Sequence, residues 1–196
     1  MLNKHFLRIG YVLKIKTKKK TMSKLKIYIK VLTDGCKPEI REDGDWIDLK
    51  AAETITLEGP FANTLHKQGN NRLRDVVFDS KYIPLGVAMK LPDGCEGWAV
   101  PRSGTWKHYK LMQPNHKGII DQSYCGPNDQ WHFPAVSFDK VTINKGERIC
   151  QFRIALSQRA TLWQKIKYWL SSGIELVYVD ELDNPNRGGL GHSGIK

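Results

Sequence analysis

Apolar and polar residues alternate over short stretches along most of the chain. The clearest case is residues 24–33, where Leu25, Ile27, Ile29 and Val31 alternate with polar residues or tyrosine. Alternation with a period of two is the pattern of a strand with one buried face. Ten more short segments read as strands, with Gly, Pro, Asn and Asp between them: 47–51, 54–58, 76–78, 85–90, 96–100, 110–113, 117–121, 135–141, 148–155 and 175–179. The chain is therefore predicted to be all-β, as a sandwich, barrel or jelly roll.

Residues 159–170 have the spacing of a helix instead. Their apolar side chains fall on one helical face and are Leu162, Trp163, Ile166, Trp169 and Leu170. Two tryptophans beside lysines would suit a helix at a membrane surface. Because the segment has fewer than four turns, we expect it to pack on the domain or on a neighbouring subunit.

Composition narrows the class of protein. With 196 residues and 40% hydrophobic residues, the chain is expected to be globular. Seven of its eleven net positive charges lie in residues 1–21, so the basicity belongs to a leader and not to a nucleic-acid-binding face. We expect residues 1–23 to be a disordered leader with a natural start at Met22, residues 24–182 to be one β domain, and residues 183–196 to be a mobile glycine-rich tail.

The remaining composition predicts an intracellular protein. The four cysteines form no C-x-x-C pair, so free thiols in a reducing cytoplasm are expected and a zinc site is not. No apolar run approaches the roughly 18 residues that span a bilayer. No membrane or nucleic-acid partner is predicted, and the protein is placed in the cytoplasm, or in the host cytoplasm if a phage encodes it.

Two segments combine polar side chains with strand ends. Residues 100–104 bring an arginine, a serine and a glycine together, which can bind phosphate oxygens, although an ordinary turn is the simpler interpretation. In residues 118–126 a short apolar strand ends at Asp121, and Tyr124 follows. The carboxylate could be a general base and the tyrosine could pack on a sugar or base. A β-turn with a capping aspartate is the alternative.

Two further segments have the same double interpretation. Residues 146–154 alternate as a strand, with Gln151 beside apolar neighbours, where a buried amide would need a partner. This pattern places Ile149 and Gln151 on one face and Cys150 on the other. Residues 188–194 contain four glycines, which permit close approach to an anion, but a disordered tail fits them equally.

Taken together and in order, these segments resemble the five motifs of the trimeric dUTPase family. The resemblance covers the chain from about Asp43 to the C-terminus, and the matching segments are 43–51, 101–104, 118–126, 146–154 and 188–194. It implies a distorted β jelly roll with one short inserted helix, assembled as a homotrimer with shared active sites. It also implies a magnesium-dependent hydrolase that converts dUTP to dUMP and pyrophosphate, limiting uracil entry into DNA and supplying dUMP for thymidylate synthesis.

The resemblance further implies a role for each matching residue. Asp121 would hold and deprotonate the attacking water, Tyr124 would lie under the deoxyribose, and Asp48 would orient water around Mg²⁺. The residues expected to bind uracil are Asn115, Gly118, Ile119 and Ile120. Those expected to bind phosphates are Arg102, Ser103, Gly104 and Gln151. The tail residues expected to close over the nucleotide are Gly189, Leu190, His192 and Ser193.

Several positions depart from the family pattern. Leu190 stands where the family has a phenylalanine, Ser123 where a second aspartate is frequent, and Arg187 directly precedes Gly188. Residues 131–134 and the helical segment look inserted. Two alternatives stay open: a dCTP deaminase of the same fold, although residues 126–129 lack the glutamate which that reaction needs, and a regulatory protein-binding scaffold.

Overall fold

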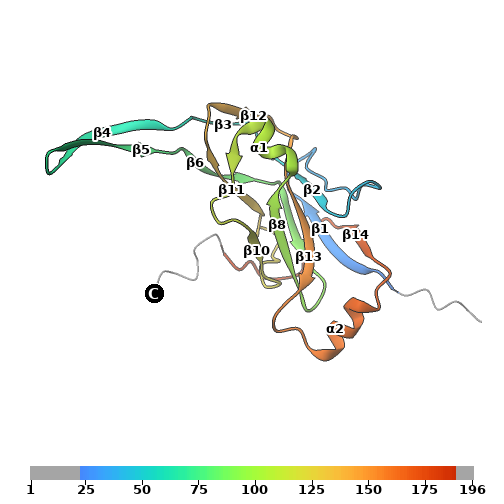
Figure 1. Ribbon diagram of the computed structural model, residues 1–196. Helices are drawn as coiled ribbons and strands as arrows, with labels where there is room; N and C mark the ends of the chain where they lie inside the picture. Colours follow the sequence, from blue (N-terminus) through green and yellow to red (C-terminus); the bar gives the residue numbers. More distant parts are fainter. Residues whose placement is uncertain (1–22, 189–196) are drawn as a thin grey trace, which may run out of the picture.

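The protein is described here by a computed structural model of residues 23–188. This part of the chain is mostly β (Figure 1). The strands are β1 (Leu25–Val31), β2 (Ile47–Lys50), β3 (Ile55–Leu57), β4 (Phe61–Gln68), β5 (Asn71–Val77), β6 (Ser80–Pro84), β7 (Val87–Lys90), β8 (Cys95–Pro101), β9 (Leu111–Met112), β10 (Gly118–Ile120), β11 (His132–Ser137), β12 (Val141–Ile143), β13 (Arg148–Leu156) and β14 (Ile174–Tyr178). The helices are α1 (Ser103–Tyr109) and α2 (Leu162–Trp169). The all-β prediction and the helix near residues 159–170 are confirmed.

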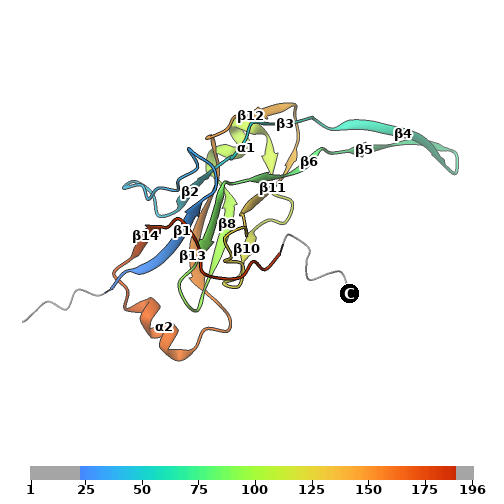
Figure 2. The same cartoon turned by 180° about the vertical axis from the view of Figure 1, so that it is seen from behind.

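Three sheets with strand orders β10-β8-β13-β2, β14-β1-β7 and β6-β11-β9 enclose the core together with the two-stranded sheet β12-β3. The last strand, β14, lies parallel to the first, β1, and the backbone N–H of Leu25 donates to the carbonyl of Gly173 over 2.8 Å. The chain after β14 then crosses the domain, and its described part reaches the neighbourhood of β10 by residue 188, as both Figure 1 and Figure 2 show.

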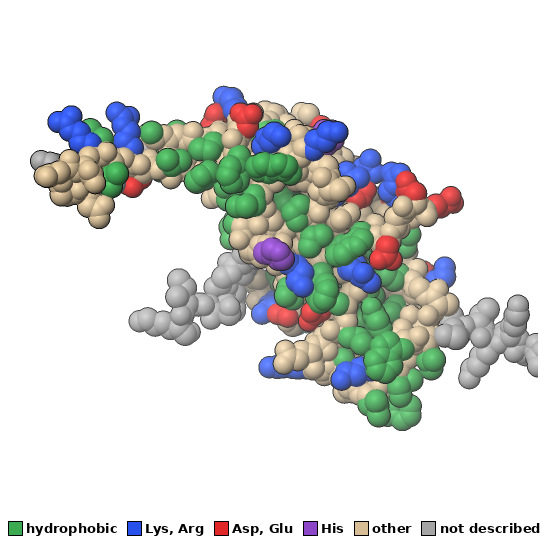
Figure 3. Space-filling model, in the orientation of Figure 1, with side chains coloured by type: hydrophobic (Ala, Val, Ile, Leu, Met, Phe, Trp, Pro, Cys, Tyr) green, Lys and Arg blue, Asp and Glu red, His purple; other side chains and the backbone are tan. Residues whose placement is uncertain are grey.

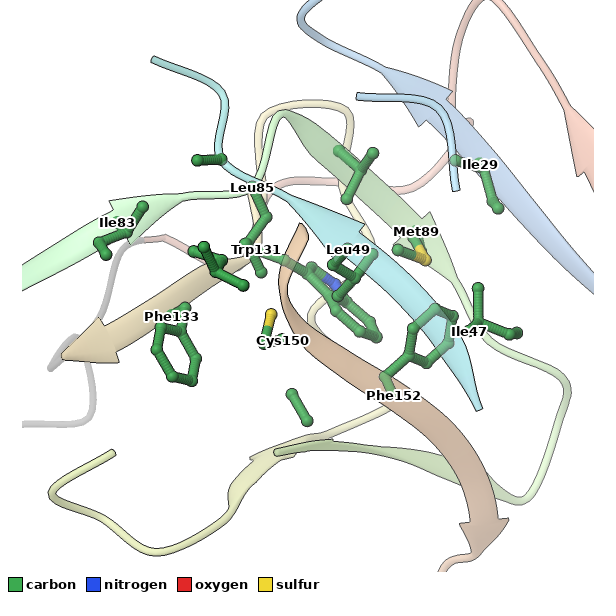
Figure 4. Close-up of a cluster of buried hydrophobic side chains, with 14 of the residues drawn as sticks. Ile29, Ile47, Leu49, Ile83, Leu85, Met89, Trp131, Phe133, Cys150 and Phe152 are labelled. Carbon is green, nitrogen blue, oxygen red and sulfur yellow. The ribbon is translucent and has the colours of Figure 1, made fainter. Parts of the chain in front are cut away.

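Aromatic side chains from β11, β13 and the loop before β11 fill the core (Figure 4). Trp131 and Phe152 meet edge to face, with ring centroids 5.1 Å apart and an interplanar angle of 75°. This geometry is a preferred one for aromatic pairs. Trp131 and Phe133 are therefore part of the core, and residues 132–134 form the start of β11.

Strand β13 departs from the predicted alternation. Its pairing with β2 shifts register between Arg148 and Cys150, and both Ile149 and Cys150 are fully buried. A bulge adds one residue to one strand of a pair, so two neighbouring side chains can face the same side. The expectation that Ile149 shares the face of Gln151 was wrong for this reason.

A two-stranded arm, β4–β5, was missed by the sequence interpretation apart from its last residues. It pairs with itself alone and projects from the body of the domain (Figure 1). Phe61, Leu65 and Val76 are exposed on it, so its two faces do not differ in polarity as those of a half-buried strand do.

Helix α2 contacts the domain through only part of its surface. Tyr168 Oη donates to the carbonyl of Ile154 over 3.4 Å, and Gln164 lies against Gly94. Trp163 and Trp169 are 78% and 67% exposed, and apolar side chains cover the lower end of the molecule in Figure 3. The predicted packing on the domain is thus only partial. No helix within residues 23–188 is long and apolar enough to cross a membrane.

Candidate active site

The four-stranded sheet β10-β8-β13-β2 holds five of the eleven predicted site residues that the structure describes, which are Asp48, Gly118, Ile119, Ile120 and Gln151. Gln151 of β13 is paired with Asp48 of β2 on one side and with Val100 of β8 on the other. Because paired residues share a face of a sheet, Asp48 and Gln151 lie side by side. The first and fourth sequence motifs are therefore neighbours in space.

Asp48 holds two guanidinium groups. Its Oδ1 accepts from Nε of Arg102 over 2.8 Å, and its Oδ2 accepts from Nη1 of Arg148 over 3.0 Å. The aspartate is 7% exposed, so this charge has little water around it and depends on its two partners. The sequence analysis selected Asp48 and Arg102 but missed the part played by Arg148. The pairing of Arg148 with Asp48 joins residues 100 positions apart.

Helix α1 begins where a turn was the simpler expectation. The backbone N–H of Arg102 donates to Oγ1 of Thr105 over 3.1 Å, and that hydroxyl donates to the carbonyl of Ile149 over 2.6 Å. These bonds fasten the start of the helix to β13. Ser103 and Gly104 occupy the first turn, where backbone N–H groups have no partner within a helix. Such N–H groups can bind an anion.

Asp121 and Tyr124 lie at the other end of β8. Asp121 directly follows β10, whose Ile120 is paired with Gly97. Tyr124 is partly buried and its hydroxyl donates to the carbonyl of Gln130 over 2.8 Å. Burial, and then the charge of Asp129, raise the pKa of the Tyr124 phenol, which favours the neutral hydroxyl that donates this hydrogen bond.

Asn115 and Gly118 surround a buried amide. Asn115 is exposed in the turn before β10, and Gly118 is paired with Ala99. Nε2 of Gln113 donates to the carbonyl of Ala99 over 3.3 Å, while Oε1 of this buried glutamine has no hydrogen-bond partner among the described residues. A Cβ added at Gly118 would lie 3.4 Å from Nε2 of Gln113, which is an ordinary van der Waals distance, so a glycine is not required here on steric grounds.

The root of the tail, which is the segment of residues 186–188, reaches Asp121. Nη1 of Arg187 donates to Oδ2 of Asp121 over 3.0 Å, and the backbone N–H of Arg187 donates to the carboxylate of Asp129. Sequence reasoning gave Arg187 no definite role and gave Asp129 none. The predicted tail residues Gly189, Leu190, His192 and Ser193 lie outside the described residues.

One chain does not bring the two halves of the site together. Gly97, which is paired with Ile120, lies five residues before Arg102, and a strand rises by roughly 3.3 Å per residue. Asp121, one residue beyond Ile120, is level with Glu96, whereas Asp48 is level with Val100 through Gln151. Asp121 is thus separated along β8 by about 13 Å from Asp48 and by about 20 Å from Arg102. A base must lie within hydrogen-bond reach of the proton it removes. The backbone positions of the two groups therefore lie far beyond the hydrogen-bond reach of a common atom.

No group of three or more His, Cys, Asp or Glu side chains in residues 23–188 could hold a metal ion by itself. The four cysteines are free, as the sequence predicted, and the structure shows that all four are buried.

Comparison with known proteins points to a single family. Residues 74–166 match the family model described as dUTPase. A prophage-derived deoxyuridine 5'-triphosphate nucleotidohydrolase of Bacillus subtilis is 41% identical over 155 residues, which covers 79% of this chain and 87% of the relative. The enzyme of the same name from Anaeromyxobacter is 30% identical and covers 79% of this chain and 83% of the relative.

Solved structures share the fold. The dUTPase of Streptococcus mutans aligns with a TM-score of 0.53 at 19% identity, covering 66% of this chain and 94% of the other. A dUTPase variant of a Staphylococcus bacteriophage gives 0.51 at 21% identity, covering 69% and 93%. These matches confirm the predicted dUTPase-type β fold. Together with 41% identity across most of both sequences, they show that the chain belongs to the dUTPase family.

Proposed function

We propose that the protein hydrolyses dUTP to dUMP and pyrophosphate. The observation that carries this proposal is the 41% identity to a prophage deoxyuridine 5'-triphosphate nucleotidohydrolase over 87% of that relative. A nucleoside triphosphate diphosphohydrolase of this kind would supply dUMP and lower the level of dUTP. We propose the cytoplasm, or the host cytoplasm for a phage-encoded protein, as its location.

Asp121 is the proposed base. Its carboxylate would accept a proton from a water molecule while the water oxygen forms a bond to the α-phosphorus. The bond between that phosphorus and the bridging oxygen to the β-phosphate breaks, and pyrophosphate leaves with the electron pair. The position of Asp121 at an exposed strand end supports this role, because both water and substrate can reach it.

Uracil and deoxyribose would bind near the same strand end. Asn115 and the backbone of Gly118, Ile119 and Ile120 would bind the edge of uracil, and the ring of Tyr124 would lie under the deoxyribose. The support is that Tyr124 is fixed by its bond to Gln130 and that these residues lie on one short strand and its flanking turns. Gly189, Leu190, His192 and Ser193 would then cover the bound nucleotide.

The opposite end of β8 would bind the triphosphate. Arg102, Ser103, Gly104 and Gln151 are the proposed phosphate contacts, and Arg148 joins them because Asp48 holds it beside Arg102. Guanidinium groups pair with phosphate oxygens in a fixed geometry, and the first turn of a helix adds backbone donors. Positive groups placed in advance stabilise the charge that develops on the leaving pyrophosphate.

A homotrimer would unite the two halves. Since Asp121 lies along β8 about 13 Å from Asp48 and about 20 Å from Arg102, we propose that one copy supplies Asp121 and a neighbouring copy supplies the phosphate-binding group. Mixing the inactive variants Asp121→Asn and Arg102→Ala, with subunit exchange, should restore activity. Random exchange in a cyclic trimer leaves about a quarter of the sites with both groups intact. Two inactive variants that stay inactive when mixed would contradict the shared site.

Magnesium would act through the substrate. The residues fit this ion without direct protein ligation, because each Asp48 oxygen accepts one guanidinium N–H and keeps a lone pair for water. Mg²⁺ retains several waters and is typically held by substrate phosphates and one or two carboxylates. When bound, it would neutralise phosphate charge, while Asp48 orients a water molecule of its shell.

The test is pyrophosphate release from dUTP, with dTTP, dCTP and UTP measured in parallel, in Mg²⁺ and then in excess EDTA. We expect selective cleavage of dUTP that EDTA abolishes. Ammonia release from dCTP would favour the deaminase alternative. A folded protein with no turnover of any of the four nucleotides would favour the regulatory scaffold.

A further inference from the structure

The turn formed by residues 126–129 contains a buried charge. Asp129 is 2% exposed, and its Oδ2 accepts from the backbone N–H of Gly126 over 2.8 Å. The backbone N–H of Asp129 donates back to the carbonyl of Gly126 over 3.1 Å. A buried carboxylate is stable only when hydrogen bonds or opposite charges compensate for lost water. The turn alone gives Asp129 one such donor.

The root of the tail supplies the rest. The backbone N–H of Arg187 donates to Oδ1 and Oδ2 of Asp129, over 3.1 and 2.9 Å. Oδ1 of Asn186 accepts from the backbone N–H of Asn128 over 2.8 Å. The turn therefore donates one hydrogen bond to the tail and accepts hydrogen bonds from it, and the residues joined are 58 positions apart in sequence.

Gly126 makes this contact possible. A Cβ added at Gly126 would lie 2.5 Å from both Cα and Oδ1 of Asn186, much closer than side chains are found. The tail backbone thus lies directly on the glycine. Gly126 has no positive φ, so an alanine there would fit its own backbone and would clash only with the tail.

The contact also sets where the tail begins. With Arg187 held, its guanidinium pairs with Asp121 over 3.0 Å, and the chain passes Gly188 beside the proposed base. Without the contact, the nearest buried residue before Arg187 is Leu182, the last residue of the β domain and five positions earlier. A longer free segment lowers the effective concentration of the residues at its end.

We propose that Asp129 is a positioning residue that anchors Asn186 and Arg187, so that the tail starts beside Asp121. The inference deepens the proposed dUTP hydrolysis and rests on it for its catalytic consequence. The anchor itself stands on the hydrogen bonds and the close contact at Gly126. Asp129 acts through the tail and does not touch the reacting atoms.

Two variants test the anchor in different ways. Asp129→Asn removes the charge that accepts from Arg187, while Gly126→Ala keeps the carboxylate and displaces Asn186. The matched controls are Asp79→Asn, which removes another carboxylate that accepts a backbone N–H, and Gly44→Ala, where a Cβ would meet only one atom at 3.9 Å. The primary measurement is the rate of trypsin cleavage after Arg187, followed by intact mass.

We expect both anchor variants to be cleaved after Arg187 at least about tenfold faster than the wild type and the two controls, because hydrogen bonds to a charged group are among the stronger ones. The kcat/KM for dUTP should fall about fivefold or more in the same two variants. Cleavage at the wild-type rate in both variants would overturn the inference, even if their thermal stability fell. Cleavage needs no substrate, so it reports on the anchor whether or not the wild type hydrolyses dUTP.

Discussion

The Asp48 cluster offers the sharpest test of how the site is held together. In Asp48→Asn, one amide oxygen can still accept from a guanidinium, while the amide NH₂ meets the other guanidinium with no acceptor. Arg102 and Arg148 would then carry two positive charges side by side without the carboxylate that now lies between them. The substitution keeps the side-chain shape, so lost charge and lost acceptors are the cause of any effect.

The expected size follows from burial. Each hydrogen bond to a charged group contributes about 1.5–3 kcal/mol, and the amide oxygen retains roughly 1 kcal/mol of one of them. The side chains of Arg102 and Arg148 are 30% and 38% exposed, so water recovers part of the loss. We expect the free energy of unfolding to fall by about 2 kcal/mol, which lowers Tm by roughly 4–8 °C in a domain of this size.

Urea and thermal unfolding at one fixed protein concentration would measure this change, because oligomer stability depends on concentration. The control is Asp45→Asn, since Asp45 is 76% exposed and pairs with Arg153 at 3.4 Å. Its loss should stay within the roughly 0–1 kcal/mol of exposed ion pairs. If Asp48→Asn unfolds no more readily than Asp45→Asn, the reasoning from burial is wrong.

Three further predictions concern the core. Burial lowers the pKa of His132 below its ordinary value of 6.5, so the unfolded chain binds this proton at a higher pH than the folded protein and the free energy of unfolding falls as pH drops below about 6.5. His132→Gln should reduce this loss of stability between about pH 7 and 5.5, and an unchanged loss would contradict the prediction. Burial raises the pKa of Cys95 to about 11, so a thiol reagent at about pH 8 should label it on unfolding, whereas rapid labelling of the folded protein would refute the assignment. Gly86→Ala should cost more than about 1 kcal/mol, because φ is +67° and a Cβ would lie 2.8 Å from Cys36, whereas Gly35→Ala has only the positive φ; equal losses in unfolding experiments would count against the steric argument.

Sequence alternation located the strands whose faces differ in burial. Leu25, Ile27 and Ile29 of β1 are buried and the residues between them are exposed, as the pattern predicted. The arm β4–β5 escaped prediction because its described side chains are mostly exposed on both faces. Helix α1 escaped because the contact that fastens it, from Thr105 to Ile149, joins residues 44 positions apart.

The candidate site shows the same division. Motif order selected Asp48, Arg102 and Asp121, because the chemistry of each is legible from its residue type and position in a motif. The partners Arg148 and Asp129 were missed, since their roles depend on pairings across 100 and 58 residues that only the fold creates.

Pyrophosphate release by Asp121→Asn tests the central claim most directly. Asn keeps the size of the side chain but cannot accept the proton from water as a carboxylate does. With Asp180→Asn as the matched control on an exposed aspartate, we predict that wild type and control release pyrophosphate from dUTP at similar rates, while Asp121→Asn is slower by at least about a hundredfold. Turnover by Asp121→Asn at the rate of the control would contradict the assignment of the base.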